Sequence, residues 1–187
     1  LTFKLAPALI AGCTIVAKPA TETPLTTLML AEIFHQVGYP PGVFNVVTGR
    51  GGEIGQALVE HPIPRKVSFT GGVATGKRLA ATAAQTNKRV TLELGGQCPA
   101  IVCDDADLDV ALPALVRQTF DNSGQFCYRV NRMYVQRGIY DTFCERFAAA
   151  ARNLIVGNGL RPGCQLGPLV NEDTFRKSES HVRDALA

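Results

Sequence analysis

The order of strand-like and helical segments constrains the fold of this chain more than any other feature of its sequence. Short apolar runs typical of strands occupy residues 13–18, 43–47, 66–70 and 89–94. Segments with helical spacing of apolar residues separate them, at residues 24–37, 51–61 and 73–86. Strands joined by helical crossovers indicate an α/β fold with a parallel sheet and helices on its faces. Because the strands lack regular polar alternation, we expect both faces to be covered.

The sequence changes character at Gly95 and Gly96, where we place a domain boundary. Residues 1–94 form the first predicted domain and residues 95–187 the second. In the second, strand patterns at 99–103 and 131–136 enclose a helical run at 105–120 that is rich in acids at its start. A long helix is predicted from Tyr140 to about Leu154, and a polar helix ends the chain.

Composition excludes several classes of function. The 187 residues are 46% hydrophobic and 19% charged, with a net charge of +3, as in ordinary globular proteins. The basic residues are scattered, so nucleic-acid binding is not supported, and no apolar run is long enough to span a membrane. The six cysteines and three histidines are isolated from one another, which argues against a metal site. Scattered thiols fit a reducing compartment, and we predict a cytoplasmic protein.

The stretch FTGGVATGKR, residues 69–78, has the frame of a phosphate-binding P-loop. A nucleotide hydrolase needs a Ser or Thr hydroxyl for Mg²⁺ directly after the lysine, and Arg78 stands there. A strand, a glycine turn and a helix start still direct backbone N–H groups at one point, which suits a phosphate of any kind. A glycine turn without a ligand is the alternative reading.

Two residues have the character of catalytic groups. Cys127 follows Gly124 and Gln125 on a turn-prone stretch, so its thiol is predicted to be exposed and nucleophilic, whereas the other cysteines lie in strand or helix patterns and are predicted to be inert. Glu93 is a carboxylate inside an apolar strand. Burial there would raise its pKa toward the range useful to a general base; the alternative is a carboxylate that faces solvent.

The chain resembles the middle of an NAD(P)-dependent aldehyde dehydrogenase, with sequence motifs most similar to those of the succinic semialdehyde branch. Sequence motifs typical of that family occur in the family's order over essentially the whole chain. They are APALIAGCTIVAKPATETPL, PPGVFNVVTG, KVSFTGG, LELGG, DDADLD, NSGQFC with NR, and LGPLVNE. The combination of LELGG and GQ-x-C at this separation is highly specific.

The resemblance implies a fold and a set of roles. Residues 1–94 correspond to part of a doubly wound, Rossmann-like dinucleotide-binding domain, and residues 95–187 to part of an α/β catalytic domain. Cys127 matches the nucleophile and Glu93 the general base. Residues that match the NAD or NADP site are Lys18, Thr21, Gly51, Gly55, Phe69, Gly71, Gly72 and Leu94. The implied reaction oxidises an aldehyde to a carboxylic acid through a Cys thiohemiacetal and thioester, in a homo-oligomer that is a dimer or tetramer.

Several departures accompany the match. Gly72 replaces the usual Ser after FTG. Thr21 stands where NAD-preferring relatives often have Glu, which leaves NADP admissible and slightly favoured over NAD.

Asp121 stands where the semialdehyde branch commonly has an Arg for the substrate carboxylate. Arg129 replaces that missing positive charge only if it points into the substrate channel. Phe126 and Tyr128 line that channel or pack under the loop.

The chain begins at Leu1 without a Met, and we expect it to be a central piece of a longer protein. The family's oxyanion Asn and its second ribose-binding Glu are expected outside residues 1–187. The alternative to an active enzyme is therefore a truncated module that binds dinucleotide without completing the reaction.

Overall fold

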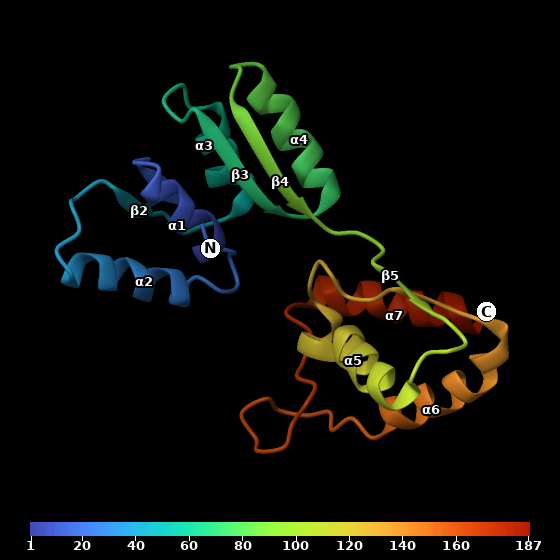
Figure 1. Cartoon of the computed structure of the whole chain (residues 1–187). Helices are drawn as coiled ribbons and strands as arrows, with labels where there is room; N and C mark the ends of the chain where they lie inside the picture. The colour runs from blue at the N-terminus through green and yellow to red at the C-terminus, as the bar shows by residue number, and fades with distance from the viewer. The chain divides into compact units, whose positions relative to one another are not determined.

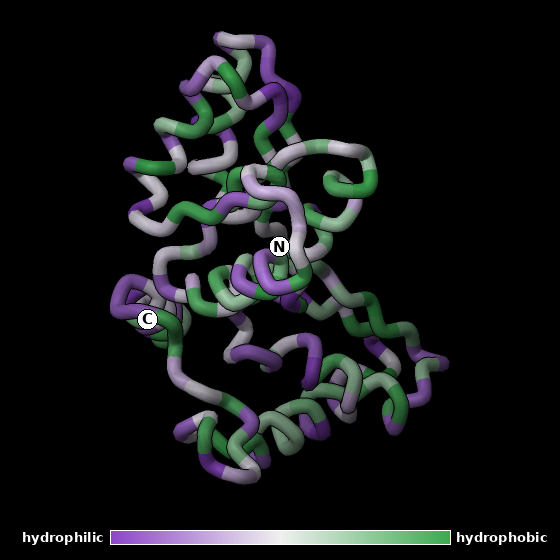
Figure 2. The backbone as a smooth tube through the Cα atoms, turned by 90° about the vertical axis from the view of Figure 1, so that its left-hand side faces the viewer, coloured by the Kyte–Doolittle hydropathy of each residue, from purple (hydrophilic) through white to green (hydrophobic).

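A computed structural model describes all 187 residues, which form two compact units, Leu1–Leu94 and Gly95–Ala187 (Figure 1). In both units helices alternate with short parallel strands, so the α/β class expected from the sequence is confirmed. Apolar residues occur in short stretches along the backbone (Figure 2). None of the helices has the length and apolar character needed to cross a membrane.

The first unit contains two parallel strand pairs, β1 with β2 and β3 with β4. All the expected strands and helices are present, some of them shorter, and the helix expected at 51–61 divides into one π-helical turn followed by α3. An additional helix precedes the first strand. In chain order the elements are α1 (Thr2–Ile10), β1 (Ile15–Ala17), α2 (Leu25–Gln36), β2 (Phe44–Val46), the π turn (Gly51–Gly55), α3 (Gln56–Glu60), β3 (Lys66–Gly71), α4 (Val73–Ala84) and β4 (Arg89–Leu94).

Helices α3 and α4 pack on one face of the β3–β4 pair. Val59 of α3 and Leu79 and Ala83 of α4 are buried against half-buried Val67, Phe69 and Val90 of the strands. Along both strands half-buried and exposed residues alternate. The expectation that both strand faces are covered is therefore wrong for this pair within the chain described.

A buried lysine holds the loop before β3 in place. Lys88 is 8% exposed, and its ammonium donates hydrogen bonds to the carbonyl oxygens of His61 (2.6 Å) and Pro64 (3.0 Å). It follows Asn87, whose positive φ of 53° reverses the chain after α4. Because an ammonium in an apolar surrounding needs such partners, Lys88 is assigned a structural role.

The second unit combines one parallel strand pair, β5 with β6, with three α-helices. Val102, Leu108, Leu112 and Phe143 form its buried core. Asp107 caps the helix after the first strand by accepting from the Asp109 backbone N–H at 2.9 Å, as its acid-rich start predicts. The elements are β5 (Pro99–Val102), α5 (Leu108–Phe120), a 3₁₀ turn (Asp121–Gly124), β6 (Arg132–Val135), a 3₁₀ turn (Arg137–Ile139), α6 (Tyr140–Arg152) and α7 (Glu172–Leu186).

Candidate active site

Cys127 lies on an irregular loop that begins where α5 ends. The 3₁₀ turn after α5 contains three successive residues with left-handed backbone: Asn122 (φ 51°), Ser123 (φ 55°) and Gly124 (φ 72°). Glycine adopts this region without cost and asparagine at a small one, whereas a serine there loses about 1 kcal/mol or more. A methyl group on Gly124 would also lie 2.7 Å from Arg129 Cδ. The loop that precedes Cys127 is therefore strained and needs other contacts to hold it.

Hydrogen bonds hold this turn internally and to a distant part of the unit. The Asn122 side-chain amide donates to Gln125 O (3.1 Å), and the Gln125 side-chain amide donates to Asn122 O (3.0 Å). Ser123 Oγ donates to Gly167 O at 2.8 Å, and the Val170 backbone N–H donates to Gln125 Oε1 at 2.8 Å. These contacts could not be predicted from the sequence, because a bond across 45 residues has no local signal.

Around Cys127 the loop presents an exposed thiol, as predicted. The Cys98 thiol donates to the Cys127 carbonyl oxygen (Sγ to O, 3.2 Å), and the Gln118 side-chain amide donates to Tyr128 O at 2.9 Å. The rings of Phe126 and Tyr128 contact each other with centroids 4.6 Å apart, and Tyr128 is 63% exposed. Three of the other cysteines, Cys13, Cys103 and Cys144, are also exposed, so exposure alone does not distinguish Cys127 from them.

Charges near the loop differ from those expected for binding an acidic substrate. Asp121 forms an exposed ion pair with Arg117 at 3.0 Å, one helical turn earlier, so a neighbouring cation partly balances its charge. Arg129 is half-buried and lies against Gly124. Its side chain therefore takes part in packing the loop.

In the first unit, Lys18 and Thr21 converge on one turn of backbone. Lys18 Nζ donates to Gly49 O at 3.4 Å and also to Pro19 O, and Thr21 Oγ1 donates to Gly49 O at 3.4 Å. Gly51 adjoins this turn: a methyl group placed on it would lie 3.9 Å from Lys18 Cε. Lys18, Thr21 and Gly51, three of the predicted cofactor residues, are therefore close to one another. A ligand that approaches Gly51 would contact the methylene groups of Lys18. Gly55, at the end of the π turn, has open space where a side chain would be.

The end of β3 and the start of α4 form the glycine turn of the P-loop-like stretch. A methyl group on Gly71 would collide with the Phe69 ring, whereas one on Gly72 would meet nothing within 4 Å. Gly72 is the N-cap of α4 and offers it no side-chain hydrogen bond. The exposed helix start therefore keeps backbone N–H donors available for an anion.

Leu94 and Glu93 lie side by side on β4 but face opposite ways. Leu94 is half-buried and packs on buried Gly76 of α4, where a methyl group would come within 2.7 Å of Leu94 Cδ2. Glu93 lies on the exposed face, paired in register with Thr70 of β3. The expectation of a buried carboxylate is wrong here; the solvent-facing alternative is observed, because the strand alternation that partly buries Leu92 and Leu94 turns Glu93 outward.

A cation lies near this carboxylate. Burial lowers the pKa of the Lys4 ammonium on α1, and the Glu93 carboxylate acts against that effect by favouring the charged lysine. Glu93 is therefore within electrostatic reach of Lys4 in the first unit.

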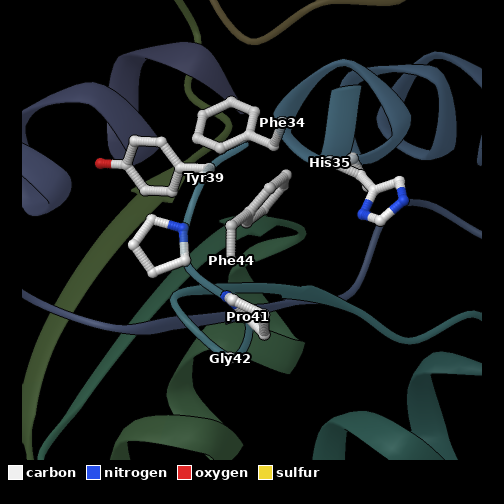
Figure 3. A pocket seen from close by; sticks show the side chains of 8 residues that line it. Phe34, His35, Tyr39, Pro41, Gly42 and Phe44 are labelled. Atoms are coloured by element: carbon white, nitrogen blue, oxygen red, sulfur yellow. The ribbon is translucent and has the colours of Figure 1, made fainter. Parts of the chain in front are cut away.

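The first unit also has a small aromatic pocket of about 120 Å³ (Figure 3). The rings of Phe34, Tyr39 and Phe44 meet at centroid distances of 4.9 and 5.0 Å, next to Pro41, while the His35 ring lies apart from them. No predicted site residue lines this pocket, and its polar groups do not converge. The three rings around it pack the turn between α2 and β2.

These features define an α/β protein with an exposed thiol on one unit and a glycine turn at a helix N-terminus on the other. The model of the aldehyde dehydrogenase family matches residues 1–187, and the chain belongs to that family. This membership argues against the nucleotide hydrolase considered for residues 69–78.

The family members most similar to the chain include enzymes named for acidic aldehydes. A mitochondrial succinate-semialdehyde dehydrogenase of Arabidopsis thaliana is 52% identical over 187 residues, which are 100% of this chain and 35% of the plant protein. A 3-sulfolactaldehyde dehydrogenase of Pseudomonas putida is 50% identical over 186 residues, 100% of this chain and 38% of that protein. The crystal structure of an E. coli NADP dependent enzyme has a TM-score of 0.96 at 49% identity and covers 99% of this chain and 38% of its own. The chain thus spans little more than a third of these relatives' lengths.

Proposed function

We propose that the protein oxidises an aldehyde to a carboxylic acid with NADP or NAD, through a thioester on Cys127. The observation that carries this proposal is the exposed thiol on a strained, multiply hydrogen-bonded loop, in a chain of the aldehyde dehydrogenase family. Residues 1–94 would bind the cofactor and residues 95–187 would supply the nucleophile.

The residues of the first unit fit a dinucleotide. Lys18 and Thr21 carry polar groups beside Gly51, whose missing side chain leaves room for a close approach. We assign them to the adenosine ribose, with Gly55 beside them. Gly71 and Gly72 at the start of α4 suit the phosphates, since backbone donors and the helix dipole favour an anion there.

Cys127 forms the covalent intermediate. Its thiolate attacks the aldehyde carbon, the C=O π electrons move to oxygen, and a tetrahedral thiohemiacetal results. The Cys127 backbone N–H would stabilise the oxyanion together with an Asn that the family supplies from outside these residues. NADP or NAD, held by the residues of the first unit named above, would supply the acceptor for the hydride that leaves this carbon. The re-formed carbonyl is then a thioester on the Cys127 sulfur.

Glu93 completes the reaction as general base. It removes a proton from water as the water oxygen attacks the thioester carbon, and the C–S bond breaks to release the acid and the thiolate. Its exposure within the first unit leaves the carboxylate accessible to water. Leu94, the next residue, would contact the nicotinamide end through its backbone.

The two named relatives act on aldehydes that carry a second, anionic group, a carboxylate or a sulfonate. We propose the same substrate class for this protein. Because Arg117 pairs with Asp121, the charge of Asp121 opposes an anionic substrate less than the sequence suggested. The Phe126–Tyr128 pair would form the apolar side of the channel.

Homo-oligomer formation and a cytoplasmic location are further proposals. Large apolar side chains, among them Phe3, Ile10, Ile101 and Leu160, are more than three-quarters exposed in the chain described. Such surface favours burial by additional polypeptide, either further chain or a second copy. The plant relative carries a mitochondrial designation, so fractionation is the direct test of the compartment.

Competitive alkylation of the protein from its complete reading frame tests the assignment of the nucleophile. We expect iodoacetamide to modify Cys127 faster than the other exposed thiols, Cys13, Cys103 and Cys144, and NADP to change only the Cys127 rate. Peptide mass spectrometry measures each rate. An aldehyde panel with NADP and NAD then distinguishes the enzyme from a binding module, which would show cofactor binding without turnover. Equal labelling of all exposed thiols, with no effect of cofactor, would oppose the proposal.

Substitution of Gly72 by serine is predicted to tighten NADP binding by about 5-fold. The site has room for the side chain and an allowed φ of −70°, and a hydroxyl at the N-cap of α4 adds a donor worth about 1 kcal/mol to the phosphates. Isothermal titration calorimetry measures the dissociation constant. Gly72→Ala is the matched control, since it adds the carbon without the hydroxyl. If both variants bind NADP equally well, the phosphates are seated elsewhere.

A further inference from the structure

The loop that carries Cys127 depends on contacts outside itself. Its first residues, Asn122 and Ser123, have left-handed backbone that they adopt only when surrounding contacts hold them there. Two side chains of this turn, Ser123 and Gln125, extend to residues 167–170, hereafter the anchor segment.

Gln125 uses both ends of its side-chain amide. Its Nε2 donates to Asn122 O at 3.0 Å, inside the strained turn, and its Oε1 accepts from the Val170 backbone N–H at 2.8 Å, in the anchor segment. The Gln125 backbone N–H also donates to Asn122 O, at 3.1 Å. One side chain therefore joins the turn to the anchor segment, two residues before the nucleophile.

The anchor segment is itself fixed at both ends. Before it, Leu166 O accepts from Gly157 N at 2.9 Å, and the Gln165 side chain accepts from Ile155 N at 2.9 Å, which ties the segment to the chain after α6. After it, Asn171 caps α7 by accepting from Thr174 N at 3.0 Å. A loop bonded to such a segment has a defined position.

We propose that Gln125 is a positioning residue, which holds the strained loop so that the Cys127 sulfur is presented in one orientation for attack. Ser123 provides a second hydrogen bond from this loop to the anchor segment, through Gly167 O. The inference rests on the proposed function in one respect: Cys127 is taken as the nucleophile. Without these hydrogen bonds to the anchor segment, the thiol would sample many orientations. Misplacement of a reacting group by about 1 Å lowers a rate by about 100-fold.

Gln125→Met tests the proposal, because it keeps the length of the side chain and removes both hydrogen bonds. In the protein from the complete reading frame, we expect kcat for aldehyde oxidation to fall by about 10- to 100-fold, while the KM for NADP changes less than about twofold. Gln125→Glu keeps an acceptor for Val170 N–H and is expected to recover part of the rate. Ser123→Ala removes only the hydrogen bond to Gly167 O. We expect it to lower kcat less than Gln125→Met does.

A second readout separates positioning from general stability. The ratio of the Cys127 alkylation rate to that of Cys103 should fall in Gln125→Met at a temperature where circular dichroism shows a folded protein. An unchanged ratio and unchanged kcat would overturn the proposal, even if the melting temperature falls. If Gln125→Met does not fold, Gln125→Glu, which loses the donor to Asn122 O and keeps the acceptor for Val170 N–H, decides on the same two measurements. A wild-type protein without aldehyde oxidation would contradict the proposed function alone, because the alkylation ratio still reports on the loop.

Discussion

Replacing Cys127 by alanine is expected to lower kcat for aldehyde oxidation by about 10⁴-fold or more, since the variant lacks the sulfur on which the thioester is proposed to form. Cofactor binding should persist, because the residues assigned to the dinucleotide lie in the other unit. Cys127→Ser should be almost as inactive, since a serine hydroxyl is not ionised at neutral pH and Cys127 has no adjacent histidine in the sequence. Reduced nicotinamide absorbance measures turnover, and calorimetry measures NADP binding.

Cys103→Ser is the matched control for this experiment. Cys103 is also an exposed thiol of the second unit, directly after β5, so its loss tests whether thiol removal alone is harmful. We expect at least half of the wild-type kcat. If Cys127→Ala retained substantial oxidation, or if Cys103→Ser abolished it, the nucleophile would be misassigned.

Glu93→Gln is expected to separate the two halves of the reaction. Acylation of Cys127 should still release one equivalent of reduced nicotinamide per site in a rapid burst, because that step does not use the carboxylate. Hydrolysis of the thioester should then slow by about 10²- to 10⁴-fold, since an amide cannot accept the proton of water. Stopped-flow absorbance resolves the burst from the steady state, and intact mass spectrometry detects the accumulated thioester.

Glu60→Gln removes an equivalent exposed carboxylate of the same unit and should leave both phases unchanged. A steady-state rate for Glu93→Gln equal to that of the wild type would assign the base to another residue. A lost burst would instead show that Glu93 acts before the thioester forms.

Much of the fold could be predicted because its signals are local. The apolar runs at β3 and β4 and the helical spacing of α4 are each contained in a few residues, and the parallel pairing follows from the helical crossover between them. The exposure of Cys127 was also predictable, since glycine, glutamine and polar neighbours interrupt the helical pattern directly before it.

The remaining features depend on packing that the sequence does not display. Glu93 and Leu94 have the same apolar surroundings in the sequence, and only the position of α4 decides which of them is covered. Cys144 belongs to a helical pattern, yet it lies on the exposed side of α6. The bond from Val170 to Gln125 joins two loops without periodicity, so no spacing rule could identify it.

The contact between Gly76 and Leu94 has a consequence for how this protein can diversify. A methyl group at position 76 would come within 2.7 Å of Leu94 Cδ2, so the two positions share one fixed volume between helix and strand. An alanine at 76 requires the Leu94 side chain to shift or a smaller residue to occupy 94, and either change falls beside the carboxylate at 93. Changes at position 76 are therefore expected to be accompanied in homologues by changes at position 94, next to Glu93.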